Sequence, residues 1–202
     1  MKKQQHRSIG SRETRVSRTS QRFEIRKNED GSRTISGTAV VFGALSEDMG
    51  FRERIASGAF TQSLKDNPNV LILAQHDMSQ PLGSVESGTA KVWQDDRGVR
   101  FTCKLPDTSW ANDLASLISD DIVRSMSFGF SVPPGGDEWS LLPDGTALRT
   151  VNTAVLYECS VVTAPAYAQT SVSLRSAPAH IREQISAIRA DVIGEELSLI
   201  HI

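Results

Sequence analysis

The sequence is poor in the residues and segments that mark several common classes of protein. Among its 202 residues it has only two cysteines, Cys103 and Cys159, and both lie in apolar segments. They do not form a disulfide framework, and their surroundings predict buried thiols in a reducing compartment. No apolar run is long enough to cross a bilayer, and no apolar h-region follows the basic N-terminus. We therefore expect neither a membrane span nor a signal peptide.

Motifs for cofactors, metals and nucleic acids are also missing. The sequence has no glycine-rich dinucleotide or phosphate loop. Its four histidines and two cysteines do not have the spacing of metal ligands, although the pair His76-Asp77 leaves a metal-dependent hydrolase as one alternative. The net charge of −2 argues against nucleic acid as a partner of the folded part. We expect no cofactor and no bound metal.

The composition predicts one domain with two tails. Residues 1–21 are polar and basic, which predicts a disordered arm. This arm either has no role or contacts an acidic partner or is cut away. Residues 22–176 hold most of the apolar segments and form the predicted domain. Residues 177–202 predict an amphipathic helix that docks on the domain or on a partner. Its apolar stripe consists of Ile181, Ile185, Ile188 and Val192.

Within the domain, short strand-like segments alternate with turn signals. Asp30-Gly31 and the segment 95–98 are typical of hairpin turns. Continuous apolar runs at 70–75 and 155–162 indicate buried strands. Helices are predicted near 58–64 and at 109–119. The predicted fold class is α+β but mainly β, a β-barrel surrounded by a few helices.

The segment 124–132 has two different faces if it forms a strand, because side chains alternate between the faces. The apolar face carries Met126, Phe128, Phe130 and Val132, and the small face carries Ser125, Ser127, Gly129 and Ser131. This pattern is typical of a core wall that lines a cleft. A serine in a cleft becomes a nucleophile when a base lies within reach. Ser127 is our candidate, with Ser125 as a competitor on the same face, unless the small side chains only allow close packing.

His76 is the candidate base because it alone among the histidines ends an apolar strand-like run. A catalytic histidine needs a nucleophile at one ring nitrogen and an acceptor at the other, and otherwise His76 is a structural residue. Glu158 is the candidate acceptor, because a carboxylate inside the apolar run 155–162 is costly unless it is paired. A salt bridge to Arg124 or Arg149 is the alternative. Asp77 is a second candidate acceptor, although neighbours on a strand point apart.

Cys159 is a further possible nucleophile for His76. Its place inside an apolar strand favours a buried structural thiol instead.

Several segments, in this order along the chain, resemble the prohead protease family of tailed phages, the Hong Kong 97-like capsid maturation proteases. These segments are 37–42, 53–60 with Ser63 and Leu64, 71–77 with 81–83, 123–130, and 158–162 with 165–167. The resemblance spans roughly residues 23–175 in the family's order, which is more specific than any single motif.

The resemblance implies a serine endopeptidase with a β-barrel like that of the herpesvirus assemblins. Motif by motif, the family's histidine falls on His76, the serine of its Ser-x-Gly-Phe motif on Ser127, and its acidic residue on Glu158. The third catalytic residue is either Glu158 or Asp77. The herpesvirus relatives use a second histidine there, and the predicted core has none.

The resemblance further implies substrates and a place of action. The expected substrates are the capsid protein with its scaffolding segment, the scaffold and the protease's own termini. The expected place is the host cytoplasm, inside the assembling procapsid, and self-association stays open. The rival hypothesis is an inactive β-barrel that serves as an internal scaffold or capsid-binding module and uses the C-terminal apolar stripe as its partner surface.

Overall fold

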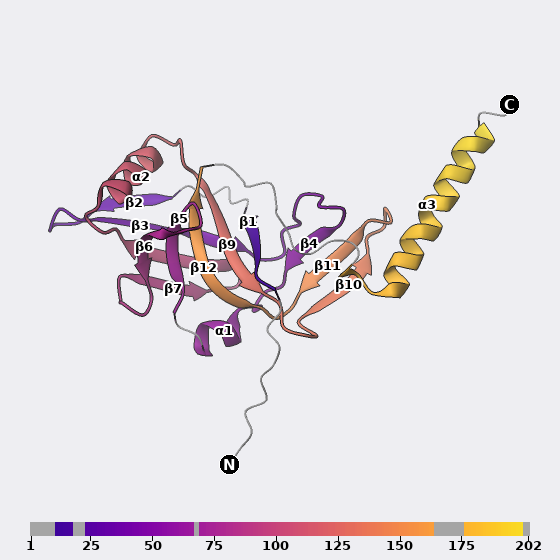
Figure 1. Ribbon diagram of the computed structural model, residues 1–202, viewed down its shortest axis with the longest axis horizontal. Helices are drawn as coiled ribbons and strands as arrows, with labels where there is room; N and C mark the ends of the chain where they lie inside the picture. Colours follow the sequence, from indigo (N-terminus) through magenta and orange to yellow (C-terminus); the bar gives the residue numbers. More distant parts are fainter. Residues whose placement is uncertain (1–10, 18–22, 67–68, 164–175, 200–202) are drawn as a thin grey trace, which may run out of the picture.

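The computed structural model describes residues 11–17, 23–66, 69–163 and 176–199, and these residues are mainly β (Figure 1). The strands form three sheets. The central sheet has the order β1 (Glu13–Ser17), β9 (Ser125–Ser131), β12 (Val155–Val162), β5 (Leu71–Ala74) and β6 (Asp77–Ser84). The second sheet has the order β2 (Glu24–Lys27), β3 (Arg33–Val41), β8 (Gly98–Lys104) and β7 (Ala90–Gln94). The small sheet has the order β10 (Asp137–Leu141), β11 (Ala147–Val151) and β4 (Arg52–Ile55).

The expectation of a β-barrel is not met by these pairings. The described strands fall into three separate sheets, and none of the three closes on itself. The many short, alternating segments predicted strands correctly. They carry no information on which strand pairs with which, and closure depends on pairing.

The main core lies where the central and second sheets pack together. Met126, Phe128 and Phe130 of β9 are buried there, as the alternation of that segment predicted. Phe60 lies edge-on to Phe128 and Phe130, with ring centroids 6.2 and 6.4 Å apart. Edge-to-face aromatic pairs stabilise a core beyond the area they bury. β9 is therefore held rigidly by its apolar face.

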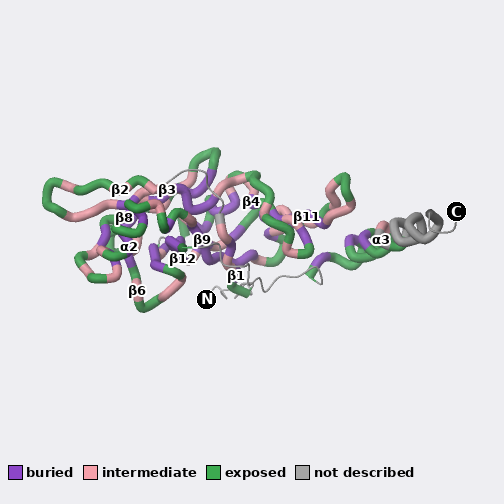
Figure 2. The backbone as a smooth tube through the Cα atoms, turned by 90° about the horizontal axis from the view of Figure 1, so that it is seen from above, coloured by how far each residue is buried: buried purple, intermediate pink, exposed green. Residues whose placement is uncertain are grey.

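The described residues include three helices, α1 (Thr61–Asp66), α2 (Ser109–Ser119) and α3 (Ala179–Leu199). The first turns of α3 pack on the small sheet, where Ile181 and Ile185 are buried in a cluster with Phe51 and the half-buried Trp139. Beyond these turns α3 extends away from the sheets (Figure 1), and the described side chains after Ile185 are exposed or half-buried (Figure 2). Part of the predicted stripe thus docks on the protein's own domain, while the side chain of Val192 lies outside the described residues. No described helix is both long enough and apolar enough to span a bilayer.

One segment of the predicted disordered arm is a strand. β1 pairs antiparallel with β9 and extends the central sheet by one strand. Its ordering does not come from a set of large apolar side chains, because Val16 is the one apolar residue of β1. It comes from ladder hydrogen bonds and from buried ion pairs of Glu13 and Arg15 with residues far along the chain. The prediction of disorder therefore failed for residues 13–17, because composition does not reveal such partners. Ser11 and Arg12 of the arm are described but are not part of the strand. Residues 1–10 and 18–21 lie outside the described residues.

Candidate active site

The three candidate residues come from three neighbouring strands of the central sheet. Ser127 lies in β9, Glu158 in the adjacent β12, and His76 directly after β5, which lies on the other side of β12. Within the β9–β12 pair, Ser127 is opposite Ser160 and Gly129 is opposite Glu158. Because opposed residues of an antiparallel pair share a face of the sheet, these four positions lie on one face.

A tight turn holds His76 at this face. β5 and β6 are joined by only Gln75 and His76, because Ala74 and Asp77 already pair with each other. Both turn residues have positive φ, 54° and 61°. Two-residue hairpins of this kind favour Asn and Gly, so Gln and His are unusual here and cost backbone energy. Strained residues of this kind are held only where the surrounding structure determines them, and they cluster at functional sites.

The imidazole of His76 is bonded to the carboxylate of Glu158. Nδ1 of His76 lies 2.8 Å from Oε1 of Glu158, whose side chain is 1% exposed. The hydroxyl of Ser160 donates to the other carboxylate oxygen at 2.5 Å. These bonds offset the cost of burying the carboxylate. An Nδ1–H that donates to Glu158 leaves Nε2 as the basic nitrogen of the ring.

Ser127 is buried beside this pair but is bonded elsewhere. Its hydroxyl donates to the main-chain carbonyl of Arg15 in β1, at 3.0 Å. Nε2 of His76 is buried and has no hydrogen-bond partner among the described residues. The structure therefore unites His76 with Glu158 directly. It places Ser127 on the next strand, where its hydroxyl bonds to β1 instead of His76.

Gly129 makes room for the carboxylate. A Cβ built at Gly129 would lie 2.5 Å from Oε1 of Glu158 and 3.1 Å from the guanidinium of Arg12. Arg12 itself lies 3.8 Å from the same Oε1 atom. Since Gly129 pairs with Glu158 across the two strands, any larger residue would push the carboxylate away from His76.

The competing candidates have other roles. Asp77 is half-buried and accepts bonds from the hydroxyl and amide of Ser79, and these bonds lower the pKa of its carboxyl. It does not contact His76 through any hydrogen bond that the described residues make. Ser131 bonds to the hydroxyl of Tyr157 at 2.8 Å. Ser125 lies at the end of β9, opposite Val162. Of the two candidate acceptors, the geometry therefore favours Glu158.

Both cysteines are buried free thiols, which disfavours a cysteine nucleophile. Burial raises the pKa of Cys103 to about 12. Burial, and then the charge of Glu158, raise the pKa of Cys159 well above its usual value. The thiolate is the reactive form, so neither residue is reactive near neutral pH.

We therefore expect both thiols to resist alkylation in the native protein. Treatment with iodoacetamide at about pH 8 should leave the intact mass unchanged. The same treatment in urea should add two carboxamidomethyl groups, one for each of Cys103 and Cys159. Rapid modification of Cys159 in the folded protein would contradict its assigned place in the core.

Sequence reasoning missed Ser160 as part of the site. The period of two along a strand was a usable signal, because it places Ser160 on the same face as Glu158. The roles of Arg12 and Arg15 had no such signal, since they depend on β1 joining the sheet.

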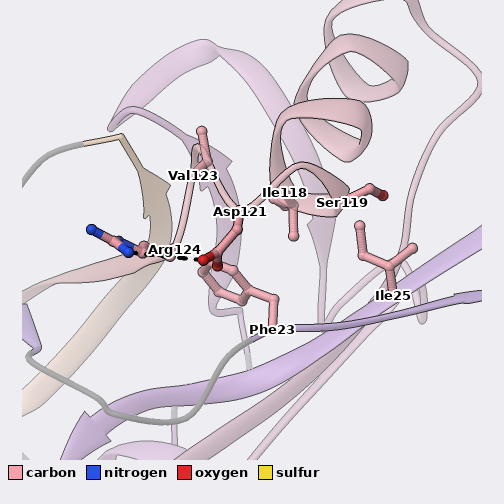
Figure 3. A pocket seen from close by; sticks show the side chains of 7 residues that line it. All are labelled: Phe23, Ile25, Ile118, Ser119, Asp121, Val123 and Arg124. Atoms are coloured by element: carbon pink, nitrogen blue, oxygen red, sulfur yellow. Dashed lines mark ion pairs between the residues drawn. The ribbon is translucent and has the colours of Figure 1, made fainter.

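A separate pocket lies away from these residues. It has a volume of about 280 Å³ between β2 and the C-terminal end of α2 (Figure 3). Its lining consists of Phe23, Ile25, Ile118, Ser119, Asp121, Val123 and Arg124. It includes none of the three candidate residues. Among the residues that the structure describes, no group of three or more His, Cys, Asp or Glu side chains is placed to hold a metal ion.

Comparisons with known proteins identify a matching family and a solved structure with a similar fold. The family model described as caudovirus prohead serine protease matches residues 21–184. Among solved structures, the capsid assembly protease of bacteriophage T4 is similar, with a TM-score of 0.52 and 14% sequence identity. That match covers 76% of this chain and 99% of the phage T4 chain, and at this identity it shows a shared fold. No curated protein matches the sequence significantly.

Proposed function

Because the chain belongs to the caudovirus prohead serine protease family, and is thus a serine endopeptidase of capsid maturation, we propose that Ser127, His76 and Glu158 are its catalytic residues. The observation that carries this assignment is the 2.8 Å bond between His76 and the buried Glu158, with Nε2 of the same ring unpartnered among the described residues. Nδ1 of His76 is already bonded to the residue that orients the ring, and Nε2 is available to accept a proton. The site then requires only a nucleophile. Ser127, on the adjacent strand β9, supplies it.

In the proposed mechanism, Ser127 attacks the carbonyl carbon of a peptide bond while Nε2 of His76 takes its proton. His76 then gives that proton to the leaving amine, and the C–N bond breaks. Water attacks the acyl-enzyme through the same base and restores the Ser127 hydroxyl. Glu158 holds the Nδ1–H tautomer and stabilises the imidazolium that forms. General acid–base catalysis of this kind contributes about 10²–10⁴-fold to the rate.

The proposed substrates are the capsid protein of the same phage with its scaffolding segment, the scaffold, and the protease's own termini. The supporting observation is family membership, since the family is named for proteases of the prohead. The proposed place of action is the interior of the assembling procapsid. The rival role as an inactive binding module is weakened because Ile181 and Ile185 of its proposed partner surface are buried on the chain's own small sheet.

Coexpression with the capsid protein of the same phage tests the proposal. The wild type should trim the capsid protein, and Ser127→Ala should leave it at full length, as read by intact-mass analysis. The matched control is Ser125→Ala, which removes a hydroxyl from the same strand at a position outside the site. Equal trimming by the wild type and Ser127→Ala would overturn the assignment of Ser127.

Replacement of Gly129 tests the placement of the carboxylate. Gly129→Ala is expected to lower kcat by about 100-fold, because displacing a catalytic group by about 1 Å can cost that much. The free energy of unfolding, measured by urea denaturation, should change much less than this loss of activity suggests. A variant with normal kcat would show that Glu158 does not need its observed position.

A further inference from the structure

β1 occupies the edge of the strand that carries Ser127. The inner neighbour of β9 is β12, and β1 fills the outer edge, with Glu13 opposite Phe130 and Val16 opposite Ser127 (Figure 1). An extended peptide that adds to a sheet edge gains main-chain hydrogen bonds for affinity, and pockets for alternate side chains give specificity. β1 is placed as such a peptide would be.

The peptide group between Arg15 and Val16 lies against Ser127. The Ser127 hydroxyl donates to the carbonyl oxygen of Arg15 at 3.0 Å. This bond is made to the main chain and not to a side chain. The carbonyl group of a peptide bond that is to be cut must lie in contact with the nucleophile, and the Arg15 carbonyl does so.

The side chain of Arg15 enters a buried acidic site. Arg15 is 5% exposed, and its Nε and Nη2 atoms donate to the two carboxylate oxygens of Glu53 at 2.7 and 3.1 Å. Its guanidinium also lies 5.5 Å from the centroid of the Phe130 ring. This two-bond fork against a carboxylate, with an aromatic face beside it, selects arginine over lysine. Glu53 is 3% exposed and belongs to β4 of the small sheet.

Glu13, two residues before Arg15, is bound by the guanidinium of Arg149. Its carboxylate accepts from Nη1 and Nη2 of Arg149 at 2.8 and 3.1 Å. Arg149 is held in place by Asp137 at 2.6 Å and by Glu53 at 2.9 Å. Without β1, the site would hold the carboxylates of Glu53 and Asp137 and the single guanidinium of Arg149. The site would then have a net negative charge where the Arg15 side chain now lies. The guanidinium of Arg149 would lie where it now binds the Glu13 carboxylate.

We propose that Glu53, Phe130 and Arg149 form the substrate-recognition site for peptides of the sequence Glu-x-Arg, cut after the arginine. β1 is the chain's own copy of that sequence and is cut between Arg15 and Val16. This inference rests on the proposed catalytic role of Ser127. Until β1 leaves, it also excludes other substrates from β9.

The cleavage step follows from these positions. The Ser127 hydroxyl turns from the Arg15 carbonyl oxygen to Nε2 of His76 and attacks the Arg15 carbonyl carbon. The Arg15–Val16 bond breaks, and Val16 leaves as an amine with the proton from His76. Water then hydrolyses the ester on Ser127. The products are a fragment that ends in the Arg15 carboxylate and a protease that begins at Val16.

The first test is the N-terminus of the protease recovered after coexpression with the capsid protein. The wild type should begin at Val16 by intact mass and N-terminal sequencing. Ser127→Ala should keep residues 1–15.

The second test uses a synthetic peptide with the sequence of residues 11–20 and the full-length wild-type protease. Cleavage should occur between Arg15 and Val16. Arg15→Gln in the peptide should lower kcat/KM by at least about 100-fold, because a polar site rejects a substrate that leaves its groups unpaired. The matched control is Arg18→Gln, which removes the same charge elsewhere in the peptide.

The third test is made on the enzyme. Glu53→Gln should remove the preference for the Arg15 peptide over the Arg15→Gln peptide. Glu138→Gln, at an exposed position of β10, should keep that preference. The ratio of the two peptides is measured on the same enzyme sample, so a loss of stability alone does not change it.

The outcomes separate the two proposals. A wild type that trims the capsid protein but cuts both peptides equally, or leaves residues 1–15 in place, overturns the recognition site and leaves the protease assignment intact. A wild type that cuts neither the capsid protein nor any peptide overturns the catalytic assignment, and the recognition site with it.

Discussion

Replacing His76 with alanine is expected to lower kcat for peptide cleavage by about 10⁶-fold, the loss typical of a serine protease that loses its base or its nucleophile. Without the imidazole, nothing at Ser127 accepts the hydroxyl proton, because the Ser127 hydroxyl meets only the carbonyl of Arg15 among the described residues. The carboxylate of Glu158 would keep its bond from Ser160. The loss should therefore appear in kcat far more than in KM.

Single-turnover kinetics on a capsid-protein fragment that contains the cleavage site would measure this loss. His180→Ala is the matched control, because His180 is an exposed residue of α3. It removes the same side chain far from β9 and should behave as the wild type. Activity of His76→Ala within tenfold of the wild type would contradict its role as the base.

Replacing Glu158 with glutamine is expected to lower kcat by about 10⁴-fold, as in triads whose orienting carboxylate becomes an amide. The shape of the side chain is kept, but its charge is lost. If the amide nitrogen faces His76, it donates to Nδ1 and forces the proton onto Nε2. The ring then presents an N–H to Ser127 and is not a base.

Asp77→Asn is the control that separates the two candidate acceptors. The carboxylate of Asp77 is bonded to Ser79 and makes no hydrogen bond to His76 among the described residues, so its loss should leave kcat close to that of the wild type. The pair of variants is compared by kcat per folded molecule, with folding checked by circular dichroism. A large loss in Asp77→Asn together with a small one in Glu158→Gln would reverse the assignment.

Local patterns predicted many elements of the fold. The helical spacing of Trp110, Leu114 and Ile118 predicted a helix at 109–119, which is α2. The apolar run 155–162 is β12. β6 is a strand although it contains Pro81 and Gly83. It lies at the edge of the central sheet, where proline costs no ladder bond on the open side.

In the candidate site, too, the sequence predicts some features and leaves others undetermined. The identities of His76, Ser127 and Glu158 follow from the sequence, because each stands out from its segment and because the ordered motifs resemble one family. Their mutual geometry does not follow from it. The bond between His76 and Glu158 joins residues 82 positions apart, and it exists because β5 and β12 pair in parallel.

The sequence by itself predicted most of the strands other than β1 and β6, the apolar faces of those strands, and the candidate residues for peptide hydrolysis, because alternation and composition act over a few residues. Only the tertiary structure decided that the three sheets stay open and that β1 pairs with β9. It also decided that Glu13 meets Arg149, 136 positions away. The physical reason is that strand partners and buried ion pairs are chosen by contacts between distant segments, and no local pattern records them.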